Sequence, residues 1–129
     1  MTRTPVSTPD APKAVGPYSQ GIVAGELVFC AGQLGLDPAT GTIVEGGVVA
    51  QAERALGNLR AVLEAAGCTF ADVVKTTIFL ADIADYPAVN DVYAMFVTDP
   101  PPARSTIAGA VMARGALVEI DAIARRPGG

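Results

Sequence analysis

Two charged residues in the carboxyl-terminal part of the chain have the types and settings that small-molecule chemistry needs. Arg104 follows the proline-rich stretch 100–103, and Glu119 lies within the apolar strand pattern 117–123. A guanidinium binds a carboxylate through two parallel hydrogen bonds, and a carboxyl group in an apolar strand has its protonation equilibrium perturbed by desolvation. The pair therefore indicates a site for a small molecule.

The absence of histidine restricts the chemistry of such a site. Any proton transfer must use a carboxyl group, a phenol, a lysine, a main-chain group or water. Cys30 and Cys68 are the only cysteines, and without histidine a zinc site lacks most of its usual ligands. We therefore expect no metal site and two free thiols, with Cys30 acting as a small buried hydrophobe rather than as a nucleophile.

Length and charge limit the classes of protein that the chain can represent. Its 129 residues predict a single domain, 1–129, whose core buries roughly two thirds of the unfolded surface. The net charge is −4 and the basic residues are scattered, so we expect no nucleic-acid partner. Because no apolar run reaches roughly 18 residues, we also expect no membrane partner and a cytoplasmic location.

The first half of the chain predicts strands and one long helix. Residues 18–23 and 27–31 have strand patterns joined by a short turn, which predicts a hairpin, and 42–44 is expected to pair briefly at an edge. Apolar residues step by three and four through 48–66, with Gly67 just past the end, which predicts an amphipathic helix. The β-branched run 73–80 predicts a central strand.

The second half predicts another helix and two further strands. The helix is expected to begin at Asp85 ahead of Pro87 and to end at 99–100, and its buried stripe to comprise Val89, Val92, Tyr93 and Phe96. Strands are expected at 104–111 and 116–124 around a turn near Arg114. We expect the first ten or so residues and residues 127–129 to be loose.

This order of elements predicts an α+β domain in which two helices cover one face of a sheet. We assign Val118, Ile120 and Ala122 to the opposite face, where they would also need burial. A self-associating sheet face is the expected solution.

Several segments in order carry a family resemblance that covers almost the whole chain. They are residues 14–21, 30–33, 51–67, 74–80 with Asn90 and Tyr93, 102–105 and 118–124. Through them the sequence resembles the reactive intermediate deaminase family, also called the enamine/imine deaminase or YjgF-type family.

The resemblance implies a fold, an assembly and an activity. The fold is chorismate-mutase-like, with a mixed β-sheet and two helices packed on one face, and it forms a homotrimer with sites between subunits. The activity is hydrolysis of 2-enamino or 2-imino acids, such as 2-aminoacrylate or 2-iminopropanoate, to 2-keto acids and ammonia. The implied partners are these small 2-imino and 2-keto acids, and the resemblance implies no metal or organic cofactor.

The resemblance also implies roles for two charged residues. Arg104 would hold the substrate carboxylate, and Glu119 would activate the attacking water and return a proton to the departing nitrogen. The alternative for Arg104 is a surface arginine, and the alternative for Glu119 is an exposed residue on an edge strand.

Four further residues are implied to bind substrate. Tyr18 would close the pocket, Gly32 would let the backbone approach the ligand, Asn90 would support the pocket loops, and Thr106 would bond through its main chain. The alternatives are core packing for Tyr18, a strand-end turn for Gly32 and a polar helix face for Asn90.

The chain departs from the family pattern beside the site. Thr106 stands where many members carry cysteine, and Ala31 stands where serine is common. A main-chain hydrogen bond at Thr106 survives the change of side chain, whereas Ala31 removes one hydroxyl from the pocket.

Two other functions stay open beside the deaminase. One is a non-catalytic trimer that binds small carboxylates or a protein partner through the same clefts. The other, which the acidic balance and the missing histidine disfavour, is an endoribonuclease.

Overall fold

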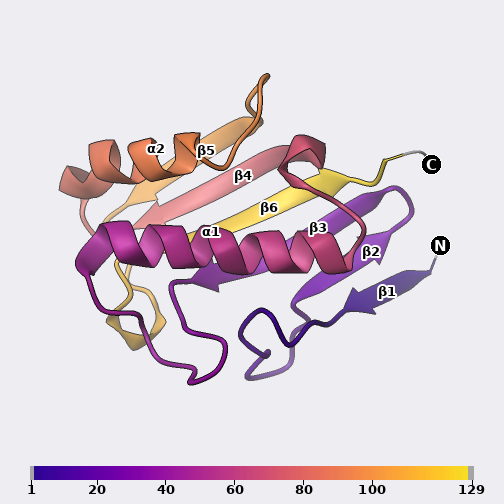
Figure 1. Cartoon of the computed structure of the whole chain (residues 1–129), viewed down its shortest axis with the longest axis horizontal. Helices are drawn as coiled ribbons and strands as arrows, with labels where there is room; N and C mark the ends of the chain where they lie inside the picture. The colour runs from indigo at the N-terminus through magenta and orange to yellow at the C-terminus, as the bar shows by residue number, and fades with distance from the viewer. Residues whose placement is uncertain (1, 128–129) are drawn as a thin grey trace.

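The computed structural model describes residues 2–127, which form one six-stranded sheet and two helices (Figure 1). Short 3₁₀ turns at 70–72, 83–85 and 113–115 lie between these elements. In chain order the strands and helices are β1 (Arg3–Val6), β2 (Gly21–Ala24), β3 (Leu27–Leu34), α1 (Gly47–Ala65), β4 (Val73–Leu80), α2 (Tyr86–Ala94), β5 (Ala103–Ala108) and β6 (Val118–Arg125).

The sheet has the strand order β1-β2-β3-β6-β4-β5 and is mixed. β4 and β5 pair in parallel because α2 crosses over between them, while the other neighbours are antiparallel. β6, the last strand in the chain, is inserted between β3 and β4. Glu119 therefore lies on an interior strand, and the alternative of an exposed residue on an edge strand is wrong.

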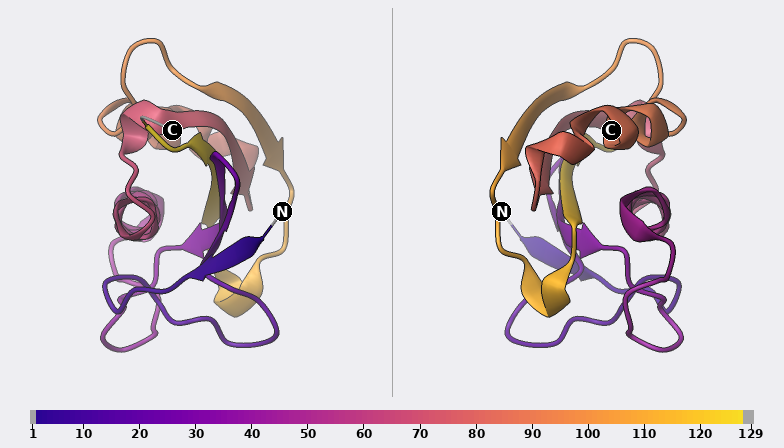
Figure 2. Two further views of the ribbon diagram at one scale, coloured as in Figure 1. Left: turned by 90° about the vertical axis from the view of Figure 1, so that its right-hand side faces the viewer. Right: turned by 90° about the vertical axis from the view of Figure 1, so that its left-hand side faces the viewer.

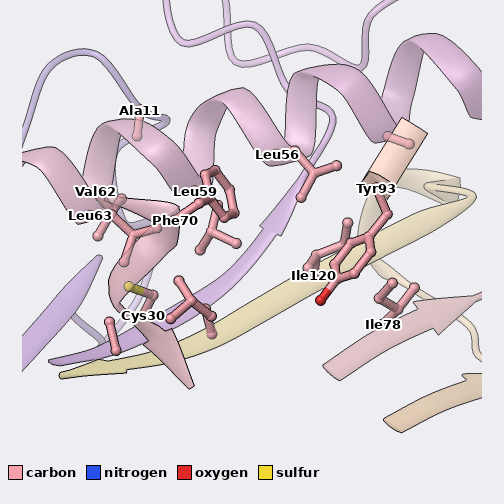
Figure 3. Close-up of a cluster of buried hydrophobic side chains, with 14 of the residues drawn as sticks. Ala11, Cys30, Leu56, Leu59, Val62, Leu63, Phe70, Ile78, Tyr93 and Ile120 are labelled. Carbon is pink, nitrogen blue, oxygen red and sulfur yellow. The ribbon is translucent and has the colours of Figure 1, made fainter. Parts of the chain in front are cut away.

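Both helices lie on the same side of the sheet (Figure 2). The side chains between α1 and the sheet are fully buried at Leu56, Leu59 and Val62, and Ile78 and Ile120 meet them from the strands (Figure 3). The core is mostly aliphatic, and its close packing fixes the position of α1 over β3 and β6.

The two faces of β6 are the reverse of our assignment. Val118, Ile120 and Ala122 are buried against the helices, whereas Glu119 and Asp121 lie on the face that no helix covers. Because side chains alternate along a strand, burial of one set forces the other set onto the opposite face. The uncovered face instead exposes apolar side chains at Leu27, Phe29 and Ile107, which are 38%, 42% and 49% exposed.

α1 and β4 are found where the sequence predicts them. A bridge between Leu36 and Ile43 supplies the brief pairing expected at 42–44.

The boundaries of other elements differ from the prediction. α2 ends at Ala94, so Phe96 packs beside the core from beyond the helix. β5 ends at Ala108 because Gly109 turns the chain with a φ of 78°. β2 begins three residues later than expected, at Gly21, β3 extends to Leu34, and β6 begins at Val118 and extends to Arg125.

The prediction of a loose amino-terminal segment is wrong, and residues 128–129 of the other segment predicted to be loose lie outside the described residues. Residues 3–6 form β1 and pair with β2. The buried Gln20 side chain then holds the following loop, because its amide nitrogen donates to the carbonyls of Thr8, Ala11 and Pro12 and its oxygen accepts from the Thr8 N–H. One side chain thus supplies the hydrogen bonds that regular structure would otherwise provide.

Asn58 is a second buried polar side chain whose hydrogen bonds hold a loop in place. This fully buried residue of α1 donates from Nδ2 to the carbonyls of Leu34 and Leu36, at 3.1 and 2.9 Å, and accepts from Arg54 Nε at 3.0 Å. It ties α1 to the chain that leaves β3.

Among residues 2–127, no helix is long and apolar enough to cross a membrane.

Replacement of Asn58 by alanine is expected to destabilise the fold by about 2–3 kcal/mol, because two carbonyls lose their donor in a buried setting. Urea unfolding at a fixed protein concentration measures the change as a lower midpoint at an unchanged slope. Glu53→Ala, an exposed change on the same helix, is the control and should shift stability by less than about 0.5 kcal/mol. Equal midpoints for the two variants would contradict the role given to Asn58.

Candidate functional site

A cleft of about 530 Å³ opens on the side of β3 and β6 away from the helices. Its walls come from the loop before β2, from the second half of β3 and from the turn before β6. Glu119, Gly32 and Tyr18 all line it. The cleft therefore gathers three of the six residues predicted for the site.

Gly32 lies directly against the Glu119 carboxylate. A Cβ atom added to Gly32 would stand 2.6 Å from Glu119 Oε2 and 2.9 Å from its Cδ, well inside van der Waals contact. The register between β3 and β6 shifts between Cys30 and Gln33, and such bulges re-aim side chains beside active sites. Only glycine leaves room here for the carboxyl group.

The protonation of Glu119 is perturbed by its setting. Burial raises the pKa of this carboxyl above its ordinary value, and the charge of Asp121 raises it further. Asp121 is two residues along the same face of β6, where its Oδ1 accepts a hydrogen bond from the Thr77 N–H at 3.1 Å. Glu119 is thus a stronger base than an ordinary glutamate.

Tyr18 lies at the mouth of the cleft and not in the core, since its side chain is 55% exposed. Its hydroxyl oxygen accepts a hydrogen bond from the Val15 N–H at 3.2 Å. The core-packing alternative for Tyr18 is therefore wrong. The hydroxyl hydrogen stays available for a ligand or water.

Arg104 lies on the other side of the sheet. In β5 it pairs with the fully buried Thr76, so its side chain is directed toward α2. Its Nη2 donates to the Tyr86 hydroxyl at 3.0 Å, and the guanidinium carbon stands 5.0 Å from the centre of the Tyr93 ring. Tyrosines, and no carboxylate among residues 2–127, hold this cation.

Two predicted residues share the neighbourhood of Arg104. Thr106 is two residues along β5 and therefore faces the same side. Asn90 is half-buried on α2, four residues after Tyr86 and three before Tyr93, so it lies on the stripe of the helix that carries both tyrosines.

The predicted site is therefore divided within one chain. Arg104, Asn90 and Thr106 lie on the side of the sheet with the helices, while the cleft with Glu119 opens on the other side. β4 separates β5 from β6 (Figure 1). A single chain does not bring together Arg104 and Glu119, the residues predicted to bind the carboxylate and to act as the base.

The sequence did not lead us to predict three residues that lie near the site. Lys13 and Arg114 line the cleft with Glu119, and Tyr86 contacts Arg104. Arg114 has a φ of 61°, rare for a residue with a side chain, and its Nη1 donates to the Gly41 carbonyl at 2.8 Å. Tyr86 could have been found from its spacing of seven residues from Tyr93 on one helix.

Potential metal ligands and thiols were located in the described part of the chain. Residues 2–127 contain no group of three or more potential metal-ligating His, Cys, Asp or Glu side chains. Cys30 and Cys68 are free thiols, as predicted, and both are buried, which was predicted for Cys30 only. Burial, followed by the charges of Cys68 and Asp121, raises the pKa of Cys30 to about 12, so its thiol stays protonated and unreactive near neutral pH.

Comparison with known proteins places these features in a family. The model of the family described as Endoribonuclease L-PSP matches residues 8–126. Protein DfrA of Myxococcus xanthus is 52% identical over 96% of each chain, and the 2-iminobutanoate/2-iminopropanoate deaminase of Capra hircus is 48% identical over 96% of this chain and 90% of its own. The crystal structure of RidA from the Antarctic bacterium Psychrobacter sp. PAMC 21119 superposes with a TM-score of 0.91 at 40% identity, over 95% of this chain and 98% of that one.

Replacement of Asp121 by asparagine is expected to lower the pKa of Glu119, because it removes a negative charge from the same face while keeping an oxygen for the Thr77 N–H. Carbon-13 NMR titration of the Glu119 carboxyl measures the change. Asp91→Asn, at an exposed position of α2, should leave that titration where it is. An unmoved or raised pKa in Asp121→Asn would show that the Asp121 charge does not act on Glu119.

Proposed function

Because the chain belongs to the family described as Endoribonuclease L-PSP, the YjgF/RidA family, we propose that it is a 2-imino-acid deaminase. It hydrolyses 2-iminobutanoate, 2-iminopropanoate and their enamine tautomers to 2-keto acids and ammonia. Relatives named as deaminases of these two imines, from several mammals, are 43–48% identical to it. The observation that carries the proposal is the Glu119 carboxyl, with its raised pKa, set in a cleft against Gly32.

The working site is assembled from two copies of the chain. Since β4 separates Arg104 from Glu119 and the two are on opposite sides of the sheet, a neighbouring copy supplies the Arg104 that reaches the cleft. The apolar residues on the uncovered sheet face, including Phe29 and Ile107, give this contact its driving force. The assembly is a homotrimer with a chorismate-mutase-like fold, in which each contact is equivalent and each holds one site.

Arg104 binds the carboxylate of the imino acid. Its guanidinium carries a permanent positive charge and has no ion pair among residues 2–127, so its charge is available to the ligand. A two-point hydrogen bond fixes the carboxylate and with it the adjacent C=N carbon.

Glu119 carries out the proton transfers. Its carboxylate accepts a proton from water as the water oxygen bonds to the C=N carbon, and it returns this proton to the nitrogen to give a neutral tetrahedral carbinolamine. Glu119 then moves the hydroxyl proton to the nitrogen, the C–N bond breaks with its electron pair on nitrogen so that ammonia leaves, and the oxygen becomes the carbonyl. The sum is one imine and one water to one keto acid and one ammonia, and the raised pKa makes Glu119 the better base for the first step.

The remaining residues shape the pocket. Tyr18 closes its mouth with an exposed ring, Gly32 leaves room for the carboxyl group of Glu119 and the ligand beside it, and Asn90 supports the wall around Arg104. The main chain at Thr106 provides a hydrogen bond. Ala31, which also lines the cleft, keeps that wall apolar.

Ribonuclease activity, which the description of the family names, is a weaker candidate. The cleft holds two basic side chains, Lys13 and Arg114, beside an acidic one, and the chain carries a net charge of −4. The side chains that line this cleft therefore do not form a track of phosphate-binding residues.

Turnover separates an enzyme from a trimer that only binds carboxylates. With imines generated by an amino-acid oxidase in the presence of catalase, and trapped with semicarbazide, Glu119→Gln is expected to lose about 10²–10⁴-fold in the rate of imine hydrolysis. It should still bind 2-oxobutanoate, whereas Arg104→Ala should lose both binding and turnover. Glu53→Gln, an exposed change on α1, is the control, and wild-type rates equal to the blank would refute the deaminase.

Mixed assemblies test whether a site takes Arg104 and Glu119 from different chains. Co-expression of the inactive Arg104→Ala and Glu119→Gln chains in equal amounts should restore about one quarter of the wild-type activity, since a site is complete only where a chain with Arg104 meets a neighbour with Glu119. Each variant assembled alone serves as the control. No recovery in mixed trimers, verified by mass, would place both residues of each site in one chain.

A further inference from the structure

The side chain of Arg104 is held by two aromatic rings. Its guanidinium carbon stands 5.5 Å from the centre of the Tyr86 ring and 5.0 Å from that of Tyr93, and Nη2 donates to the Tyr86 hydroxyl at 3.0 Å. Both distances lie within the range of cation–π attraction. We call Tyr86 and Tyr93 the tyrosine pair.

Helix α2 and the buried contacts of Tyr93 fix the position of the tyrosine pair. Tyr86 and Tyr93 are seven residues apart on α2, so two helical turns place them on one stripe. Tyr93 is buried beside Ile78 and Ile120 (Figure 3), and its hydroxyl is hydrogen-bonded to Thr76 Oγ1 at 2.6 Å. Tyr86 begins the helix and is more exposed, and Arg104 is the hydrogen-bond partner found for its hydroxyl.

A neutral partner suits an arginine that must bind an anion. A carboxylate partner would neutralise the guanidinium and compete with the ligand, and residues 2–127 offer Arg104 none. A tyrosine hydroxyl occupies one of its five N–H groups and leaves its charge intact. An arginine that moves freely loses much rotamer freedom on binding, whereas one already held loses less.

We propose that Tyr86 and Tyr93 are positioning residues that hold the Arg104 guanidinium in one orientation for the carboxylate of a 2-imino or 2-keto acid. The identity of that ligand rests on the proposed function, while the restraint on Arg104 does not. Tyr93 fixes the inner face of the guanidinium, and Tyr86 fixes its orientation through the hydroxyl. The tyrosine pair thereby sets the affinity for the carboxylate and takes no part in the proton transfers.

Tyr86→Phe is the sharpest variant, because it removes the hydroxyl, keeps the ring and lies outside the core. Loss of one hydrogen bond to Arg104 is expected to weaken binding of 2-oxobutanoate by about 3- to 10-fold, measured by calorimetry. Tyr86→Leu, which also removes the ring, should weaken it further, and the melting temperature of Tyr86→Phe should stay at that of wild type. Arg60→Gln is the matched control, since it removes a cation–π contact of 5.3 Å with Phe96 on the side of α1.

Two outcomes of the binding measurements would overturn the proposal. Unchanged or tighter binding in Tyr86→Phe would mean that the hydroxyl does not help, or that it competes with the ligand. An equal loss when Tyr86→Phe is added to Arg104→Lys would mean that Tyr86 acts on the ligand itself, because lysine does not present the planar fork that the tyrosine pair holds.

A measurement without ligand separates this proposal from the deaminase. In nitrogen-15 spectra of the free protein, the Arg104 side chain, identified by the signal that Arg104→Lys removes, should show restricted rotation in wild type and averaging in Tyr86→Phe. The same averaged signal in both proteins would overturn the restraint even if turnover is found. Restricted rotation and weakened binding in a protein without turnover would instead refute the deaminase and leave the tyrosine pair in place.

Discussion

β6 is hydrogen-bonded along both edges, to β3 and to β4, and its alternation decides what each face of the sheet can hold. Val118, Ile120 and Ala122 fill the space under the helices. Their burial leaves Glu119 and Asp121 no position except the opposite face. The position of Glu119 in the cleft, and with it the proposal that a second copy of the chain completes the site, follows from this one strand being central.

The two charged residues of the proposed site lie in unequal settings. Glu119 is half-buried against Gly32 and beside Asp121, so its ionised form is less favoured than in water. Arg104 has no carboxylate partner among residues 2–127, and aromatic rings and a hydroxyl contact its guanidinium. In the proposed site, Arg104 binds the substrate carboxylate and Glu119 accepts a proton from water.

Local patterns predicted α1 and β4 closely because their periodicity and the turn residues at their ends act over a few residues. The ends of α2 and β5 were less predictable, since packing of Phe96 and the turn at Gly109 compete with propensity. β1 was missed because Arg3 to Val6 is mostly exposed and gains its order from pairing with β2. Its partner strand lies too far along the chain for a local sequence pattern to predict the pairing.

The sequence by itself determined the class of the fold, the absence of histidine chemistry, and Arg104 and Glu119 as the charged residues to consider, because residue types and short spacings carry that information. Tertiary structure alone decided which face of β6 is buried, that β4 lies between the two charged residues, and that Tyr86 contacts Arg104. Strand order and register depend on contacts between segments far apart in the chain, and alternation has the same period whichever face is turned inward.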